Sequence, residues 1–272
     1  GRRMALRNMG VRVGYFWPPL GDRQVLRMKS KITTGAMSAQ FRPLRVFLAA
    51  CLFSLVAMVS AQVKALEKRT LVEINTTAGR MVVELYNETP AYRDNFLKLV
   101  REHFYDSTLF HRVIPGFMIQ GGDPDSRAAD DRTVELGNGG PGYTLPAETH
   151  PDLIHRKGAL AAARLGDDVN PQHRGSGSEF YIVQGRTWRA ADLQQLVDRM
   201  NADRPDSAKV HYTPDQVQTY ENLGGTPHLD GNYTVFGQVV DGMDVLDRIA
   251  DLPCDAMDRP LTDVRIWMRV LQ

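Results

Sequence analysis

The sequence predicts a fold dominated by β-strands, an antiparallel sheet or barrel. Short runs of β-branched and aromatic residues recur from residue 70 onward, and Gly-rich turns separate them. Helical spacing is confined to a few segments, and strands and helices do not alternate as they would in a parallel βαβ sheet. This pattern is typical of antiparallel architectures, closed barrels included.

The expected strands are runs of β-forming residues. They are Leu71–Asn75, Met81–Leu85, Phe110–Ile114, Met118–Gln120, Ala159–Ala163, Glu179–Gln184 and Thr234–Val240. Thr76-Thr77-Ala78-Gly79 joins the first two and supplies a Gly for positive φ, which predicts a hairpin. A last strand is expected at Val264–Leu271, because apolar residues at every second position mark a strand with one buried face.

Two helices are expected beside these strands. Thr89-Pro90 opens the first, since Thr can cap free N–H groups and Pro fits the first helical turn. Apolar residues from Tyr92 to Val100 then follow at helical spacing and give the helix one apolar face. Asp241-Gly242 leads into the second helix, Met243–Ala250.

A helical insertion is expected at about residues 186–226. Arg189–Asn201 carries an apolar stripe at helical spacing, and Thr213-Pro214 opens a second short helix. In the simplest interpretation the stripes of the two helices pack on each other or on the barrel wall. The alternative is that the insertion forms one rim of a substrate groove.

Residues 37–61 have the parts of a secretory signal peptide. A cationic start precedes an unbroken apolar run, Val46–Val59, and small residues then favour cleavage after Ala61. The run is shorter than the roughly twenty residues that a membrane span needs. Two alternatives stay open: an uncleaved anchor, and a lipoprotein modified on Cys51 within Leu48-Ala49-Ala50-Cys51.

Composition suggests the remaining boundaries. Residues 1–36 are rich in Arg, lack periodicity and precede Met37, which has a complete signal behind it, so we interpret them as a non-native upstream extension; an unusually long leader is the alternative. Residues 62–69 are interpreted as a polar linker, and residues 70–272 as the folded domain.

Removal of the leader changes the charge of the chain. Residues 1–61 hold 10 of the 33 Lys and Arg but one of the 32 Asp and Glu, which leaves 23 cations, 31 anions and a net charge of −8. An acidic domain without a basic stripe argues against nucleic acid as a partner. Cys254 is then the sole cysteine, so no intramolecular disulfide is expected.

One motif is long enough to identify a family. Residues 110–123 read FHRVIPGFMIQGGD, and the sequence resembles the cyclophilin signature at every defined position of that motif. Matching segments follow in the family's order: GALAAAR at 158–164, GSEFYIV at 177–183 and LDGNYTVFG at 229–237. The resemblance runs from about Thr70 to Gln272 and is interrupted by the insertion.

The resemblance implies a fold and an activity. The fold is a closed eight-stranded antiparallel β-barrel capped by two helices. The activity is peptidyl-prolyl cis-trans isomerisation, which would assist the folding of exported proteins in a periplasm or outside the cell. The expected partners are proline-containing polypeptides, bound by a monomer without cofactor, metal, nucleic acid or stable membrane insertion. The alternative is a proline-peptide-binding chaperone or scaffold with little catalysis.

The resemblance also implies the site residues. Arg112 would stabilise the twisted amide, Gln120 would orient the Arg112 guanidinium or the substrate carbonyl, and Phe117 completes the catalytic set. The implied substrate-binding residues are Met118, Ala163, Arg164, Glu179, Tyr181, His228, Leu229 and Tyr233.

Several of these residues differ from those of many eukaryotic members. His228 stands for Trp, Tyr233 for His, Tyr181 for Phe, Glu179 for Gln and Arg164 for Asn. The change at His228 argues against strong cyclosporin sensitivity. Glu179 places a carboxylate near the substrate backbone, where we expect it to pair with Arg112 or Arg164.

Other motifs do not predict a site. Gly137–Gly142 fits GxGxxG, but Pro141 lies inside it and no helical pattern follows, so no phosphate loop is expected. The seven histidines lack the spacing of metal ligands. Gly175–Ser178 lacks the spacing of a nucleophile elbow and is interpreted as a turn.

Overall fold

The computed structural model describes residues 68–271. The expected signal peptide at 37–61, the upstream stretch at 1–36 and most of the linker at 62–69 lie outside the described residues. Within the described range no helix has the length and apolar character to cross a bilayer.

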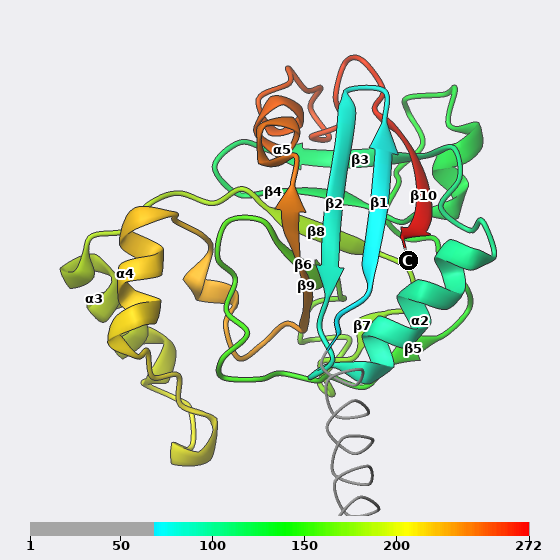
Figure 1. Cartoon of the computed structure of the whole chain (residues 1–272). Coiled ribbons are helices and arrows are strands. Elements are labelled where there is room, and N and C mark those ends of the chain that lie inside the picture. The colour runs from blue at the N-terminus through cyan, green and yellow to red at the C-terminus, as the bar shows by residue number, and fades with distance from the viewer. Residues whose placement is uncertain (1–67, 272) are drawn as a thin grey trace, which may run out of the picture. The chain divides into compact units, whose positions relative to one another are not determined.

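Eight strands close into a barrel in the order β1-β10-β3-β4-β8-β6-β9-β2, and all neighbours are antiparallel (Figure 1). The strands are β1 (Leu71–Thr76), β2 (Gly79–Leu85), β3 (Thr108–Ile114), β4 (Met118–Gly121), β6 (Ala159–Ala162), β8 (Phe180–Val183), β9 (Val235–Asp241) and β10 (Arg265–Leu271). The predicted closed antiparallel barrel is confirmed, and closure leaves no free sheet edge.

The alternation at the end of the chain has the expected result. Ile266 and Met268 of β10 are buried in the core, whereas Trp267 between them is exposed. Beside the start of β10, Gly79 closes the β1–β2 hairpin with φ +139°. A Cβ atom there would lie 2.8 Å from Val245 Cγ2, so the turn requires both the conformation and the small size of glycine.

Two helices cover the barrel core, α2 (Pro90–Arg101) and α5 (Met243–Ala250). In Figure 1, α5 lies near the upper end of the barrel and α2 near its lower end. Each helix contributes one apolar face. Phe96 and Leu99 of α2, and Leu246 and Ile249 of α5, are buried in the main core cluster. The expectation of two capping helices is therefore confirmed.

The start of α2 differs from the prediction in one detail. Thr89 precedes the helix, but its side chain makes no capping hydrogen bond. Glu148 takes that role from a distant loop, since its Oε2 accepts a hydrogen bond of 3.2 Å from the Ala91 backbone N–H. The sequence could not show this, because the acceptor is far from the helix along the chain.

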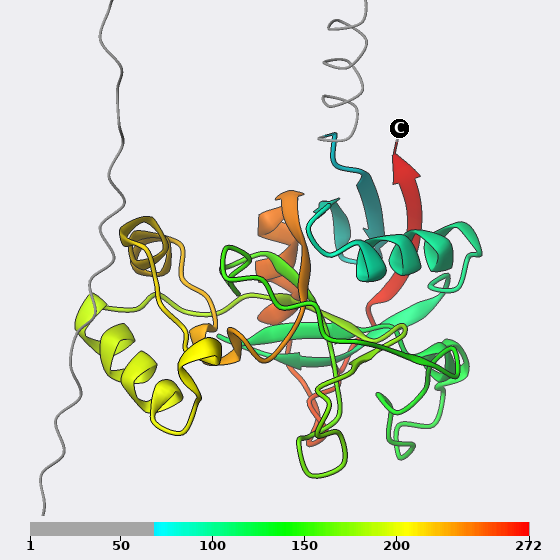
Figure 2. The same ribbon diagram turned by 90° about the horizontal axis from the view of Figure 1, so that it is seen from below.

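The insertion contains α3 (Ala190–Asn201), a short 3-10 helix (Asp206–Ala208) and α4 (Pro214–Asn222). Figures 1 and 2 both show α3 and α4 together on one side of the barrel, away from α2. Their buried residues Leu193 and Tyr220 form a small core with Ile154. The apolar stripes therefore pack on each other and on the segment before β6, which agrees with the first part of the simplest interpretation.

The Gly-rich segments form connections beside the barrel. A two-stranded sheet joins β5 (Thr144–Leu145) to β7 (Gly175–Ser176), so part of the expected turn at 175–178 is a short strand. Gly137 donates its N–H to Asp123 Oδ2 at 2.5 Å. The Gly-rich loop is thus attached to the end of the signature motif.

Candidate active site

A pocket with a volume of about 190 Å³ opens on the barrel surface. Its lining consists of Arg112, Phe117, Met118, Gln120, Ala163, Arg164, Tyr181, Leu229 and Tyr233. Sites for drug-sized ligands usually measure roughly 300–1,000 Å³, so this pocket suits a single small ring. The structure brings together all the predicted site residues except Glu179 and His228, which lie beside the pocket.

Sheet register places three of these side chains next to one another. Arg112 on β3 pairs with Gln120 on β4, and Gln120 pairs with Tyr181 on β8. Residues paired directly across neighbouring strands have Cβ atoms about 4.5–5.5 Å apart on one face of the sheet. Three separated sequence segments therefore present one row of side chains.

A register irregularity explains why Arg112 faces the solvent. The β3–β4 pairing shifts between Phe110 and Arg112, so strict alternation is broken at His111. Phe110 and His111 are both buried, while Arg112 is exposed. Bulges of this kind redirect side chains and are common beside active sites.

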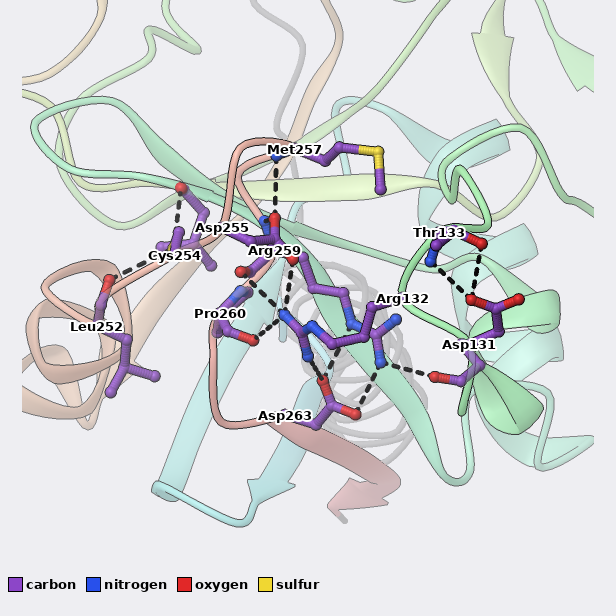
Figure 3. A network of polar contacts seen from close by, with 12 residues as sticks. Asp131, Arg132, Thr133, Leu252, Cys254, Asp255, Met257, Arg259, Pro260 and Asp263 are labelled. Carbon is purple, nitrogen blue, oxygen red and sulfur yellow. Dashed lines mark hydrogen bonds and ion pairs between the residues drawn. The ribbon is translucent and has the colours of Figure 1, made fainter.

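The Arg112 guanidinium has two polar neighbours. Its Nη1 donates to Gln120 Oε1 at 3.4 Å, so the two side chains that the resemblance assigns to the site are in hydrogen-bond contact. Its Nε lies 3.5 Å from Asp258 Oδ2. Asp258 belongs to the loop after α5, and Figure 3 shows the polar contacts that hold this loop. Sequence reasoning missed Asp258, because nothing in the loop pattern indicates a contact with β3.

Glu179 lies under Gln120, inside the protein. Its carboxyl is buried, and its Oε2 accepts a hydrogen bond of 3.3 Å from Gln120 Nε2. Burial raises the pKa of Glu179 to about 8; the hydrogen bond from Gln120 opposes this rise, and the charge of Asp123 adds to it. At neutral pH the Glu179 carboxyl is therefore protonated.

His111 is the second buried titratable group. Its Nε2 lies 3.6 Å from Glu179 Oε2, and burial lowers the pKa of His111 to about 4. Neither ring nitrogen makes a hydrogen bond to a described residue. At neutral pH both partners are uncharged, so the contact is a packing of two neutral polar groups and not an ion pair.

The expected pairing of Glu179 with Arg112 or Arg164 is wrong. Arg164 Nη1 bonds Asp167 Oδ1 at 2.6 Å, Arg164 Nε donates to the Asn232 carbonyl, and its guanidinium lies over the Tyr233 ring. Arg112 extends toward the solvent, whereas Glu179 points inward. A buried carboxyl without a cation remains neutral, which is the state that burial favours.

Aliphatic and aromatic side chains form much of the pocket wall. Met118 and Leu229 are almost fully buried, and Phe117 is half-buried. His228 contacts Phe117 from outside the pocket, with ring centroids 5.7 Å apart. Two of the eight residues predicted to bind substrate are therefore not part of the pocket lining. His228 contacts the pocket residue Phe117, and Glu179 lines an adjoining Gly-rich groove with a volume of about 760 Å³.

The pocket floor contains a hydrogen bond that the sequence did not indicate. Tyr181 is 4% exposed, and its hydroxyl lies 3.0 Å from Nε2 of His155, a fully buried residue before β6. Their rings are nearly parallel, at 13°. His155 carries no periodic or motif signal, so only the folded structure reveals it.

This arrangement offers a fixed cation at the edge of an apolar cup. It fits a reaction in which charge or a lone pair develops beside a small apolar ring. No described group of three or more His, Cys, Asp or Glu side chains could hold a metal ion. The described lining can supply apolar contacts and charged hydrogen-bond donors, the guanidinium groups of Arg112 and Arg164.

Comparison with known proteins gives a consistent family. The family model "Cyclophilin type peptidyl-prolyl cis-trans isomerase/CLD" matches residues 71–269. A Staphylococcus aureus protein named "Putative peptidyl-prolyl cis-trans isomerase" is 34% identical over 196 residues, which cover 72% of this chain and 88% of the relative.

A second relative is larger than this chain. It comes from Streptococcus pyogenes, is named "Putative bifunctional phosphatase/peptidyl-prolyl cis-trans isomerase", and is 36% identical over 198 residues. The match covers 72% of this chain and 37% of that relative. This chain thus corresponds to little more than a third of the relative's length.

Solved structures agree on the fold. A crystal structure of a Cryptosporidium parvum cyclophilin type peptidyl-prolyl cis-trans isomerase has a TM-score of 0.52 and 24% identity, and covers 75% of this chain and 99% of that one. The same protein in the presence of the dipeptide Ala-Pro has a TM-score of 0.51. The family model over residues 71–269 and the 34% identical relative show that the chain belongs to the cyclophilin-type peptidyl-prolyl cis-trans isomerase family, and its described domain is an enzyme of that class.

Proposed function

We propose that this protein isomerises X-Pro bonds in exported polypeptides and so assists their folding. The observation that carries the proposal is the pocket itself: Arg112 stands at the rim of an apolar cup large enough for one proline ring. In this proposal Met118, Leu229 and Tyr181 hold the ring, while Ala163 and Arg164 border the chain that precedes it.

The chemistry requires no broken bond. The peptide C–N bond has partial double-bond character with a rotation barrier of about 18–20 kcal/mol, so uncatalysed X-Pro isomerisation takes tens to hundreds of seconds. Twisting the amide ends its conjugation and leaves a lone pair on the proline nitrogen. A cation that donates a hydrogen bond to that lone pair stabilises the transition state more than the ground state.

Two observations support this role for Arg112. Its exposed side chain lines the pocket, and its Nη1 donates to Gln120 Oε1 at 3.4 Å. Millisecond turnover requires about 5–7 kcal/mol of differential binding. A charge-assisted hydrogen bond together with a rigid grip on the ring can supply that amount.

The export role rests on the leader. The apolar run Val46–Val59 and the small residues before Gln62 are typical of a cleaved signal peptide. We therefore propose a periplasmic or secreted enzyme that acts as a monomer on proline-containing polypeptides. The chaperone or scaffold alternative would use the same pocket for binding, but it leaves Arg112 without a role.

Two measurements test the proposal. The purified protein should accelerate isomerisation of an X-Pro test peptide, and mass spectrometry of the protein from its native cell envelope should find a first residue near Gln62. Peptide binding without acceleration would instead support the chaperone alternative. A species that retains Val46–Val59, or carries lipid on Cys51, would contradict release as a soluble enzyme.

A further inference from the structure

A chain of buried hydrogen bonds runs from the insertion to the pocket floor. It begins at Tyr212 and Tyr220 of the insertion and passes through Asp230 and His155 to Tyr181. The lining of the pocket includes no described residue of the insertion. The insertion therefore reaches the site from beneath and not as a rim of the groove.

Asp230 is the centre of this chain. Its Oδ2 accepts hydrogen bonds of 2.5 Å from both the Tyr212 and the Tyr220 hydroxyls. Its Oδ1 accepts 2.8 Å and 2.6 Å bonds from the backbone N–H and Nδ1 of His155. Asp230 is 4% exposed, so these four donors take the place of water around its carboxylate.

The acceptor at Asp230 fixes the hydrogen on His155. A carboxylate can only accept, so Nδ1 of His155 must carry the hydrogen that lies between them. In the neutral imidazole Nε2 is then an acceptor, and the Tyr181 hydroxyl at 3.0 Å donates to it. The hydroxyl of Tyr181 is thereby directed under the pocket, and the apolar part of its ring is left to face the substrate.

This geometry explains a residue that is unusual for a pocket floor. A tyrosine there introduces a polar group where an apolar surface is needed, and an unpaired buried hydroxyl is costly. His155 satisfies the hydroxyl, so Tyr181 can serve as an apolar floor. Because Tyr220 is fully buried and Tyr212 half-buried, the insertion fixes the end of the hydrogen-bonded series that lies at Asp230.

We propose that Asp230 and His155 are positioning residues for the Tyr181 floor, and that Tyr212 and Tyr220 anchor them to the insertion. The proposal rests on the proposed function, since it assigns the proline ring to this pocket. A displaced floor weakens ground-state and transition-state binding alike. The effect is therefore expected in KM, with kcat retained.

The test uses the full chain with Tyr212→Phe and Tyr220→Phe combined. Each change removes one hydroxyl oxygen and touches no pocket residue. We expect KM for an X-Pro test peptide to rise about three- to tenfold, with kcat within about twofold. The matched control is Asn201→Ala. It removes two hydrogen bonds to Val210 inside the insertion but keeps every hydrogen bond between Tyr212, Tyr220, Asp230, His155 and Tyr181. The control should keep the KM of the parent.

A Tyr181→Phe background separates positioning from general loosening. Phenylalanine has no hydroxyl for His155 to bind. In this background the paired changes at Tyr212 and Tyr220 should therefore give the same KM as the Tyr181→Phe variant alone. An equal rise in KM in both backgrounds, or no rise in the parent background, would overturn the proposal.

Equilibrium unfolding of the parent, the Tyr181→Phe variant, the paired Tyr212 and Tyr220 variant and the combination of all three changes distinguishes failure of the proposal from failure of the proposed function. If the hydrogen bonds couple Tyr181 to the insertion, the midpoint shift of the combined variant differs from the sum of the shifts caused by Tyr181→Phe and by the paired Tyr212 and Tyr220 changes. Additive midpoints overturn the hydrogen-bonded coupling, whatever the activity. Non-additive midpoints in a protein that does not accelerate isomerisation uphold the coupling and reject the proposed catalysis.

Discussion

Glu179 and His111 show how burial sets the chemistry of single residues near the site. The cyclophilin segment that residues 177–183 resemble has glutamine at the position of Glu179, and a protonated glutamate has nearly the same shape and can also both donate and accept a hydrogen bond. With a pKa raised to about 8, Glu179 remains in that form at neutral pH. Glutamate in place of glutamine at position 179 therefore adds no charge to the site at neutral pH.

The raised pKa of Glu179 predicts a pH-dependent stability. The pKa of Glu179 in the folded protein, about 8, exceeds the ordinary value of 4.5. Its contribution to the free energy of unfolding is therefore fully present below pH 4.5 and is lost as the pH rises through 8. Glu179→Gln removes this titration. When the pH is raised from 5 to 9, we expect the free energy of unfolding of the parent to fall by about 4 kcal/mol relative to that of the variant.

Urea unfolding of both proteins at the two pH values measures this difference. His111 also titrates, but it is present in both proteins and its effect largely cancels in the comparison. A stability difference that does not change with pH would show that Glu179 ionises as an ordinary surface carboxyl does.

The loop between α5 and β10 shows how an element without regular structure is held in place. Arg259 is 3% exposed, and its guanidinium bonds Asp263 (Figure 3). The same guanidinium also donates to the Ala129 carbonyl. Arg132 joins the same Asp263 to Asp255. These contacts fasten two loops together and hold Asp258 beside Arg112.

Removal of Arg259 tests this account of the loop. Arg259→Ala leaves Asp263 and the Ala129 carbonyl without their buried donor, so we expect a loss of about 2–3 kcal/mol in the free energy of unfolding. Arg132→Ala, at a residue that is 35% exposed, should lose less. Denaturant unfolding compares the two, and equal losses would contradict a special role for the buried guanidinium.

Peptide turnover should change little in the Arg259→Ala variant. The contact between Arg112 and Asp258 is an exposed ion pair, and such pairs contribute at most about 1 kcal/mol.

At the scale of the whole molecule, the barrel could be predicted from the sequence because its strands are locally encoded. Every expected strand is present, with ends shifted by at most two residues. The period-two pattern of β10 and the signature at 110–123 required no knowledge of distant contacts. The pocket residues followed from the signature and its companion segments.

The parts that sequence reasoning missed depend on contacts between distant segments. Glu148 meets the start of α2, Asp258 meets Arg112, and His155 joins Asp230 to Tyr181. Each partner lies on a loop or beside a strand end, where no periodicity indicates its direction. The inward turn of Glu179 was missed for a related reason, because its burial is a property of the closed barrel and not of its own strand.

The central claim is that Arg112 stabilises the twisted amide, and the direct test is peptide isomerisation by the Arg112→Ala protein beside the parent. The side chain is 44% exposed, so the fold and its denaturant midpoint should be retained. We expect kcat to fall by about 10²–10³-fold, as for the loss of one preorganised charged donor, while KM changes little. Arg112→Lys keeps the positive charge but loses the planar, forked donor geometry of the guanidinium, so its kcat should lie between those of the parent and the Arg112→Ala protein. Undiminished kcat in a folded Arg112→Ala protein would contradict the mechanism.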